Sequence, residues 1–146
     1  MPVEPGAVDA NVLVYAMDVD ATQHAASRAL VEAARNPAIT LLVISQILCE
    51  FYSIVTNPRR VTVARTPEEA LDVIGVFLAL PGMRVLPMPA GTVSRWMDLV
   101  RRHPVKGGEV FDLQLVATLQ ANNIDRIYTF NKGDFEAFPE LHVLTP

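Results

Sequence analysis

Short apolar segments alternate along this chain with longer segments of helical periodicity, and this alternation limits the possible folds more than any other feature. The candidate strands are Thr40–Ile44, Met83–Met88, Arg126–Phe130 and His142–Leu144. The segment from Ala7 to Tyr15 fits a strand, a helix start, or one followed by the other. Strands separated by helices are typical of α/β domains with a mainly parallel sheet.

The segments between these candidate strands are predicted to be helices. Apolar spacing or end signals place them at residues 22–35, 45–56, 66–80, 92–102 and 109–122. The strongest start is Thr66-Pro67-Glu68-Glu69, which offers an N-cap, a proline at the first helical position and acids in the first turn. Ser45 is a candidate N-cap. The prolines of Asn36-Pro37, Asn57-Pro58 and Pro81-Gly82 are expected to end three of the helices.

The composition fits one well-filled domain in a reducing cytosol. The chain has 146 residues, of which 51% are hydrophobic and 19% charged. No apolar run reaches the roughly 18 residues of a membrane span, and the first residues do not resemble a signal peptide. The single cysteine, Cys49, is expected to be a buried thiol. The net charge of −4 argues against binding nucleic acid by bulk electrostatics, but not against handling phosphates through a bound metal.

Asp112 is the most informative acidic residue. On a helix from Glu109, positions 112, 115, 116 and 119 share one face, and the other three are Leu115, Val116 and Leu119. A carboxylate in the middle of a buried face is costly unless it is paired, although the helix N-terminus favours its charge. The alternative to a functional role is an aspartate satisfied by backbone N–H groups.

Three more acids are candidates because of where they fall. Asp9 is expected at the carboxyl end of the first strand, an edge where α/β sheets bind ligands, but it fits a turn or an N-cap equally well. Glu50 lies at the rim of the apolar face of its helix, where a solvated glutamate is the ordinary outcome. Asp134 follows the strand 126–130 and fits either a site or a short helix cap, and the amide oxygen of Asn131 competes for the same role.

Together these acids predict a metal site. If the strands are parallel, Asp9, Glu50, Asp112 and Asp134 converge at one end of the sheet, where their charges would repel one another. A hard divalent cation relieves that repulsion, since Mg²⁺ binds carboxylate oxygens and leaves positions open for a phosphate. Such ions activate water and stabilise the leaving oxygen of a phosphodiester.

The order of these residues resembles the PIN domain, and more closely the VapC-like toxins of prokaryotic toxin–antitoxin pairs. The matching pieces are Val8-Asp9-Ala10-Asn11, Gln46-Ile47-Leu48-Cys49-Glu50-Phe51, Phe111-Asp112-Leu113-Gln114-Leu115-Val116-Ala117-Thr118, and Thr129-Phe130-Asn131 with Asp134-Phe135. They cover nearly the whole chain. The resemblance implies that residues 1–146 form a single three-layer α/β/α PIN-like domain with a mainly parallel central sheet.

The resemblance also implies an activity and partners. It implies an endoribonuclease that uses Mg²⁺, with Mn²⁺ as a possible substitute. Asp9 and Asp112 would be the principal metal ligands, and Glu50 would contact the metal or its waters. The fourth acid of the family usually falls where this chain has Asn131, so Asp134 and Asn131 compete for that position. The family is usually homodimeric and is bound by an antitoxin. The alternative function is a non-catalytic PIN-like module that binds RNA or a protein.

Basic and aromatic residues near these segments have two interpretations each. The basic residues close to them in sequence are Arg59, Arg60, Arg65, Arg101, Arg102, His103, Lys106 and Lys132, which could border the site and hold phosphates or be ordinary surface charges. Trp96 belongs to an apolar stripe with Val93, Met97 and Val100. Packing in the core or in a dimer is a better interpretation of that stripe than base stacking.

Overall fold

The computed structural model describes residues 2–146 and contains one five-stranded sheet. The strands are β1 (Gly6–Val8), β2 (Leu41–Ile44), β3 (Met83–Leu86), β4 (Arg126–Tyr128) and β5 (His142–Leu144). Their order across the sheet is β3-β2-β1-β4-β5, and all four neighbouring pairs are parallel. The predicted parallel sheet is therefore confirmed.

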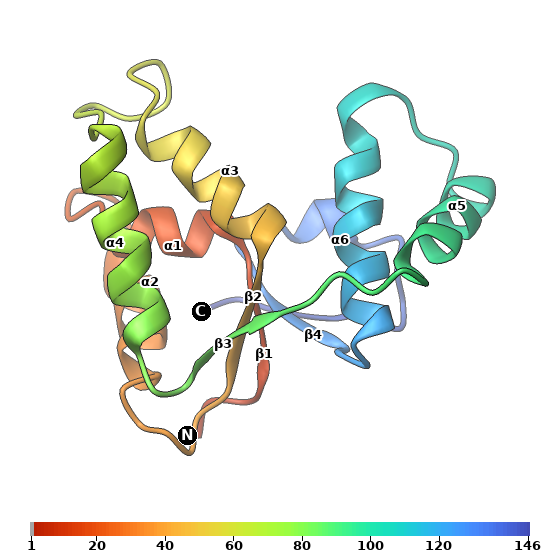
Figure 1. Ribbon diagram of the computed structural model, residues 1–146, viewed down its shortest axis with the longest axis horizontal. Helices are drawn as coiled ribbons and strands as arrows, with labels where there is room; N and C mark the ends of the chain where they lie inside the picture. The colour runs from red at the N-terminus through yellow and green to blue at the C-terminus, as the bar shows by residue number, and fades with distance from the viewer. Residues whose placement is uncertain (1) are drawn as a thin grey trace.

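Helices cover both faces of this sheet. They are α1 (Ala10–Ala16), α2 (His24–Ala33), α3 (Ser45–Val55), α4 (Pro67–Ala79), α5 (Thr92–Arg102) and α6 (Val110–Ala121), with short 3₁₀ turns η1 (Gly107–Glu109) and η2 (Lys132–Phe135). Figure 1 shows α1 to α4 on one side of the strands and α5 and α6 on the other. The three-layer α/β/α architecture is confirmed.

The strand order creates a crevice next to β1. The connections from β1 to β2 and from β2 to β3 carry helices α1 to α4 over one face, whereas the connection from β3 to β4 carries α5 and α6 over the other. When the connections from two adjacent strands pass over opposite faces of the sheet, an open crevice forms at the carboxyl ends of those strands. α/β proteins bind their ligands in this crevice. In this chain that point lies at the ends of β1 and β4.

Some local predictions are confirmed and one is wrong. Thr66 caps α4, with its Oγ1 accepting a hydrogen bond from the Glu69 N–H at 3.2 Å. The ambiguous first segment is a strand followed at once by a helix, with Asp9 between them as the N-cap. Ser45 is not a cap: it is the first helical residue of α3, and Ile44 holds the cap position without a side-chain hydrogen bond. The reason is that β2 passes into α3 with no intervening turn.

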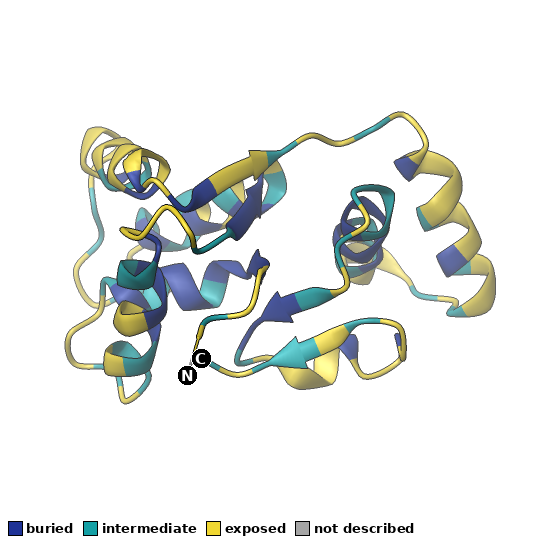
Figure 2. Cartoon of the chain, turned by 90° about the horizontal axis from the view of Figure 1, so that it is seen from below, coloured by how far each residue is buried: buried dark blue, intermediate teal, exposed yellow. Residues whose placement is uncertain are grey.

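The core lies between the sheet and the two helical layers. Figure 2 shows the buried residues concentrated on the central strands and on the helix faces turned toward them. Cys49, expected to be buried, is exposed, because it lies on the solvent side of α3. In the predicted stripe of α5, Trp96 is half-buried and packs against the core, while Val93 and Met97 are 52% and 41% exposed. Among the described residues, no helix is both long and apolar enough to cross a membrane.

Candidate active site

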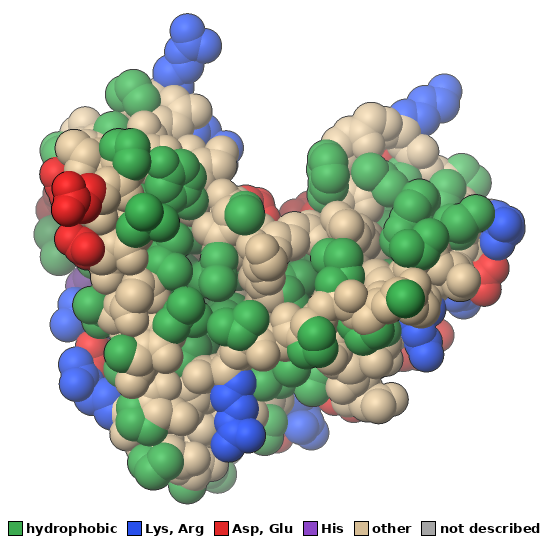
Figure 3. Space-filling model, in the orientation of Figure 1, with side chains coloured by type: hydrophobic (Ala, Val, Ile, Leu, Met, Phe, Trp, Pro, Cys, Tyr) green, Lys and Arg blue, Asp and Glu red, His purple; other side chains and the backbone are tan. Residues whose placement is uncertain are grey.

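The predicted acids line one cavity at the carboxyl ends of β1 and β4. Its volume is about 370 Å³, and its lining residues are Asp9, Gln46, Glu50, Gly108, Phe111, Asp112, Leu115, Asn131 and Asp134. Figure 3 shows the hollow between the two helical lobes, with acidic side chains at its floor. The fold therefore brings together all four predicted acids, and Asn131 as well. Their role as metal ligands stays a prediction.

Asp9 is the most buried of these acids, with a relative exposure of 7%. Its Oδ1 accepts a hydrogen bond from the Ala10 N–H at 2.8 Å, and its Oδ2 accepts one from Thr129 Oγ1 at 2.8 Å. Both alternatives for this residue are therefore realised, because the same carboxylate caps α1 and lines the cavity. Burial raises the pKa of Asp9, these hydrogen bonds lower it, and the nearby charge of Asp134 raises it. The net direction is upward.

A small polar network fixes the Asp9 carboxylate across two strands. Asn11 Nδ2 donates to Asp9 Oδ2 at 3.1 Å and to Thr129 Oγ1 at 2.9 Å. Asn11 Oδ1 accepts from the Phe130 N–H at 3.1 Å, and the Asn131 N–H donates to Thr129 Oγ1 at 3.0 Å. This network ties the residues after β1 to those after β4. Thr129 was not predicted as a functional residue, and its only signal in the sequence was its place in the Thr129-Phe130-Asn131 piece of the family resemblance.

We expect Thr129→Val to destabilise the protein by about 1–3 kcal/mol. Thr129 is fully buried, so valine fills the same space but removes a donor to Asp9 and an acceptor for the Asn131 N–H. The measurement is urea unfolding at neutral pH. The matched control is Thr118→Val, equally buried, whose hydroxyl donates only to the Gln114 carbonyl within α6. Equal losses in the two variants would show that the network contributes nothing specific.

Asp112 lies in the first turn of α6 and is half-buried. Leu115, Val116 and Leu119 are buried as predicted, but so are Leu113 and residues 117 and 118, so α6 is enclosed on nearly all sides beyond its first turn. The prediction that Asp112 sits in the middle of a buried face is therefore wrong. It sits where the helix emerges into the cavity. Desolvation, and then the charges of Asp134 and Asp9, raise its pKa to about 6.

Glu50 and Asp134 complete the acidic floor from two other elements. Glu50 comes from α3 and Asp134 from η2, and both are exposed as residues although they line the cavity. The pKa of Glu50 is raised by desolvation, then by the charges of Asp9 and Asp112, while Arg60 opposes the shift. Because Glu50 is exposed overall, solvent screens this shift and its effect on stability is small. Asn131 lines the same cavity as Asp134, so both residues stay candidates for the predicted fourth position.

Gln46 was not predicted as a site residue, although it lies four residues before Glu50 and so on the same side of α3. Its Nε2 donates to the Phe111 carbonyl at 2.9 Å, which joins α3 to the start of α6 across the cavity. Its Oε1 is buried and accepts no hydrogen bond from the described residues. The cavity therefore offers several carboxylates and an unsatisfied amide oxygen.

This donor set fits a hard cation. Oxygen ligands with net negative charge are what Mg²⁺ binds, usually through one or two carboxylates and several waters. Within residues 2–146, however, no three Asp, Glu, His or Cys side chains are placed so that they could hold one ion directly as they stand. The arrangement thus suits an ion that keeps part of its water shell better than one enclosed by protein ligands.

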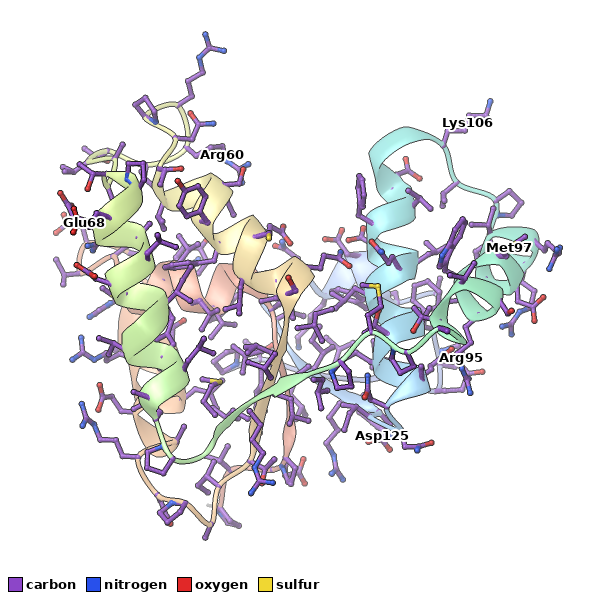
Figure 4. The ribbon with its side chains drawn as sticks, in the orientation of Figure 1. Arg60, Glu68, Arg95, Met97, Lys106 and Asp125 are labelled. Carbon is purple, nitrogen blue, oxygen red and sulfur yellow. The ribbon has the colours of Figure 1, made fainter. Side chains whose placement is uncertain are left out.

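Two basic side chains lie toward the tops of the two lobes. Arg60 follows α3 and its charge reaches Glu50, whereas Lys106 precedes α6 and Figure 4 shows its side chain directed away from the hollow. Two other predicted candidates point to different roles: Arg101 pairs with Asp98 at 2.9 Å, and the His103 ring packs edge-on against Phe138 at 5.2 Å. Cations at the rim and acids at the floor form a charge pattern suited to a polyanion with one phosphate at the floor.

Comparison with known proteins identifies the family. The model of the PIN domain family matches residues 7–141. VapC ribonuclease Mb2897 of Mycobacterium bovis is 33% identical over 120 residues, which cover 80% of this chain and 79% of that protein. Ribonuclease VapC24 of Mycobacterium tuberculosis is 29% identical over 140 residues, covering 95% and 94%.

Solved structures agree with the fold. A crystal structure of M. tuberculosis VapC20, a toxin that cleaves the sarcin–ricin loop, matches with a TM-score of 0.66 at 17% identity, covering 90% of this chain and 94% of that one. VapBC2 from Rickettsia felis, bound to a DNA fragment from its promoter, matches with a TM-score of 0.66 at 19% identity and covers 97% and 98%. By its matched residues and its relatives, the chain belongs to the PIN domain family.

Proposed function

We propose that this protein is a Mg²⁺-dependent endoribonuclease, the toxin of a toxin–antitoxin pair. The observation that carries the proposal is the convergence of Asp9, Glu50, Asp112 and Asp134 on one cavity at the ends of β1 and β4. The ribonuclease activity named for the relatives supports the reaction class. Mg²⁺, when bound, supplies activation of water and stabilisation of the charge that develops on the phosphodiester.

The residues of the chain supply position and charge. Thr129 and Asn11 hold the Asp9 carboxylate in one orientation, so that it needs no reorganisation when a substrate binds. Asp112 and Glu50 face the floor from α6 and α3, the two sides of the cavity. Arg60, whose charge reaches Glu50, attracts a phosphate next to the one that reaches the acids.

An antitoxin protein and a second copy of the chain are the proposed partners. The matching structure from Klebsiella pneumoniae is a toxin–antitoxin complex, and one from nontypeable Haemophilus influenzae is VapBC-1. Both likenesses are below 25% identity, so the partner itself is inferred from the family. The exposed Val93 and Met97 on α5 offer apolar area to a second copy. Light scattering of the purified chain measures the oligomeric state.

The alternative function is a non-catalytic module that binds RNA or a protein. End-labelled RNA and a generic phosphate monoester, each incubated with the purified chain and Mg²⁺, distinguish the functions. Cleavage of RNA alone supports the proposal, and turnover of the monoester alone points to a phosphatase. No turnover, together with no binding of Mn²⁺ by calorimetry, would establish the non-catalytic module.

A further inference from the structure

Phe111 places an unpaired aromatic ring on the wall of the acidic cavity. It immediately precedes Asp112, lines the same cavity, and is 59% exposed. The aromatic pairs among residues 2–146 are Tyr15 with Phe130, Phe51 with Phe77, and His103 with Phe138. A large apolar side chain beside carboxylates contributes nothing to binding a metal. Its position is therefore explained neither by the core nor by the proposed metal chemistry.

The backbone that carries the ring is held in place. Gln46 Nε2 donates to the Phe111 carbonyl at 2.9 Å, so the residue is fixed to α3 as well as to its own helix. The backbone of Phe111 thus has a defined position relative to Asp112 and Glu50, which keeps the ring on the wall of the cavity. Because the anchor point is set in advance, a planar partner has only the ring torsions left to order when it binds.

We propose that the Phe111 ring stacks against an unpaired base of the substrate RNA, beside the phosphate that is bound at the acidic floor. The inference rests on the proposed ribonuclease function and adds a residue that positions its substrate. A base reaches the wall of the cavity only when it is not stacked inside a duplex, so the substrate is single-stranded RNA or an open loop. Phenylalanine has no polar group with which to read a base edge, and every base has a π-face, so this nucleotide is tolerant of base identity.

Trp96 is the alternative aromatic residue, and the structure argues against it. It is half-buried, packs against the core from α5, and does not line the cavity. Phe111 differs from it on all three points. The stacking role therefore belongs to the residue that shares the wall with the acids.

The test is a comparison of Phe111→Ala, Phe111→Leu and Phe111→Trp in cleavage of a single-stranded oligoribonucleotide with Mg²⁺. We expect Phe111→Ala to raise KM by about 5- to 150-fold, which is the range for loss of one stacked base. Leucine keeps apolar bulk without a π-face and should resemble alanine, whereas tryptophan should resemble the parent. Leu71→Ala is the control, because Leu71 on α4 is 60% exposed, nearly the same as Phe111, and does not line the cavity.

A substrate with an abasic nucleotide beside the cleaved bond isolates the contact. With that substrate, the parent and Phe111→Ala should have the same KM if the ring stacks on the missing base. A parent that cleaves RNA while Phe111→Ala keeps its KM on the intact oligonucleotide would overturn the inference and leave the proposed function standing. If Phe111→Ala keeps its KM but binds a co-expressed protein more weakly than the parent does, the ring belongs to the interface with a protein partner instead. A parent that cleaves no RNA would overturn the proposed function itself.

Discussion

Asp112→Asn is expected to lower the rate of RNA cleavage by at least about 100-fold while the protein remains folded. Asparagine has the shape of aspartate but lacks the negative charge that holds a divalent ion. Because Asp112 is only half-buried and opens into the cavity, the substitution leaves no void in the core. Loss of activity therefore reports the charge and not a damaged fold. The measurement is the initial rate with saturating Mg²⁺, with circular dichroism to follow folding.

The matched control for this variant is Glu109→Gln. Glu109 precedes α6, is exposed, and its charge reaches Asp112, but it does not line the cavity. The Glu109→Gln substitution removes one negative charge from the same region as Asp112→Asn. Its rate of RNA cleavage should nevertheless stay close to that of the parent, because the side chain does not reach the cavity. If Asp112→Asn cleaves RNA as fast as the parent, the acids have been assigned to the wrong reaction. If both variants lose activity equally, then activity depends on the total negative charge around the start of α6 and not on Asp112 itself.

Removal of divalent ions is expected to abolish cleavage and to leave a protein that is less stable at pH 8 than at pH 5. Asp9, Glu50 and Asp112 all have raised pKa values, that of Asp112 rising from 3.8 to about 6. The folded state therefore holds these protons more tightly than the unfolded chain does. The free energy of unfolding therefore falls as the pH rises through the window between about 4 and 6. Above that window the whole loss of stability remains.

The size of this effect follows from Asp112. A shift of one pKa unit corresponds to about 1.4 kcal/mol. Only the part of this shift that lies above pH 5 is lost between pH 5 and pH 8, and solvent in the open cavity screens some of it, so the loss expected from Asp112 is at most about 1 kcal/mol. Because metal binds the deprotonated acids, Mg²⁺ should raise the melting temperature more at pH 8 than at pH 5.

Thermal unfolding in EDTA and in Mg²⁺ at the two pH values measures these effects. Asp112→Asn is the internal control, because it removes the largest of the three shifts and should flatten the pH dependence in EDTA. Cleavage that continues at the parent rate in EDTA would remove the metal from the mechanism. A melting temperature that Mg²⁺ changes equally at both pH values would mean that the ion binds elsewhere.

The order of strands and helices could be predicted because it depends on local patterns. The capping residues of α4 and the apolar, β-branched run of β2 are signals within a few residues, and both were read correctly. Errors arose where tertiary context decides. Cys49 shares a helix with buried residues but faces solvent, and Ser45 loses its role as a cap because β2 continues directly into α3.

The acids that line the cavity could be located from the sequence, but the residues that hold the cavity together by hydrogen bonds could not. Asp9 and Asp112 stand out because each is a charge at a strand exit or beside an apolar face. Gln46 acts through a backbone carbonyl 65 residues away, and Thr129 through a carboxylate 120 residues away. No local pattern indicates such partners, because the sheet and not the sequence separation determines which residues meet.

The distance in sequence between Asp9 and Thr129 also determines when the site can form during synthesis of the chain. β1 lies in the centre of the sheet, and its neighbour β4 is made more than 100 residues later. Until Tyr128 and Thr129 have left the ribosome, Asp9 lacks both the strand beside it and the hydroxyl that orients it. The cavity described above therefore cannot form during synthesis until the last part of the chain, from β4 onward, folds onto the rest.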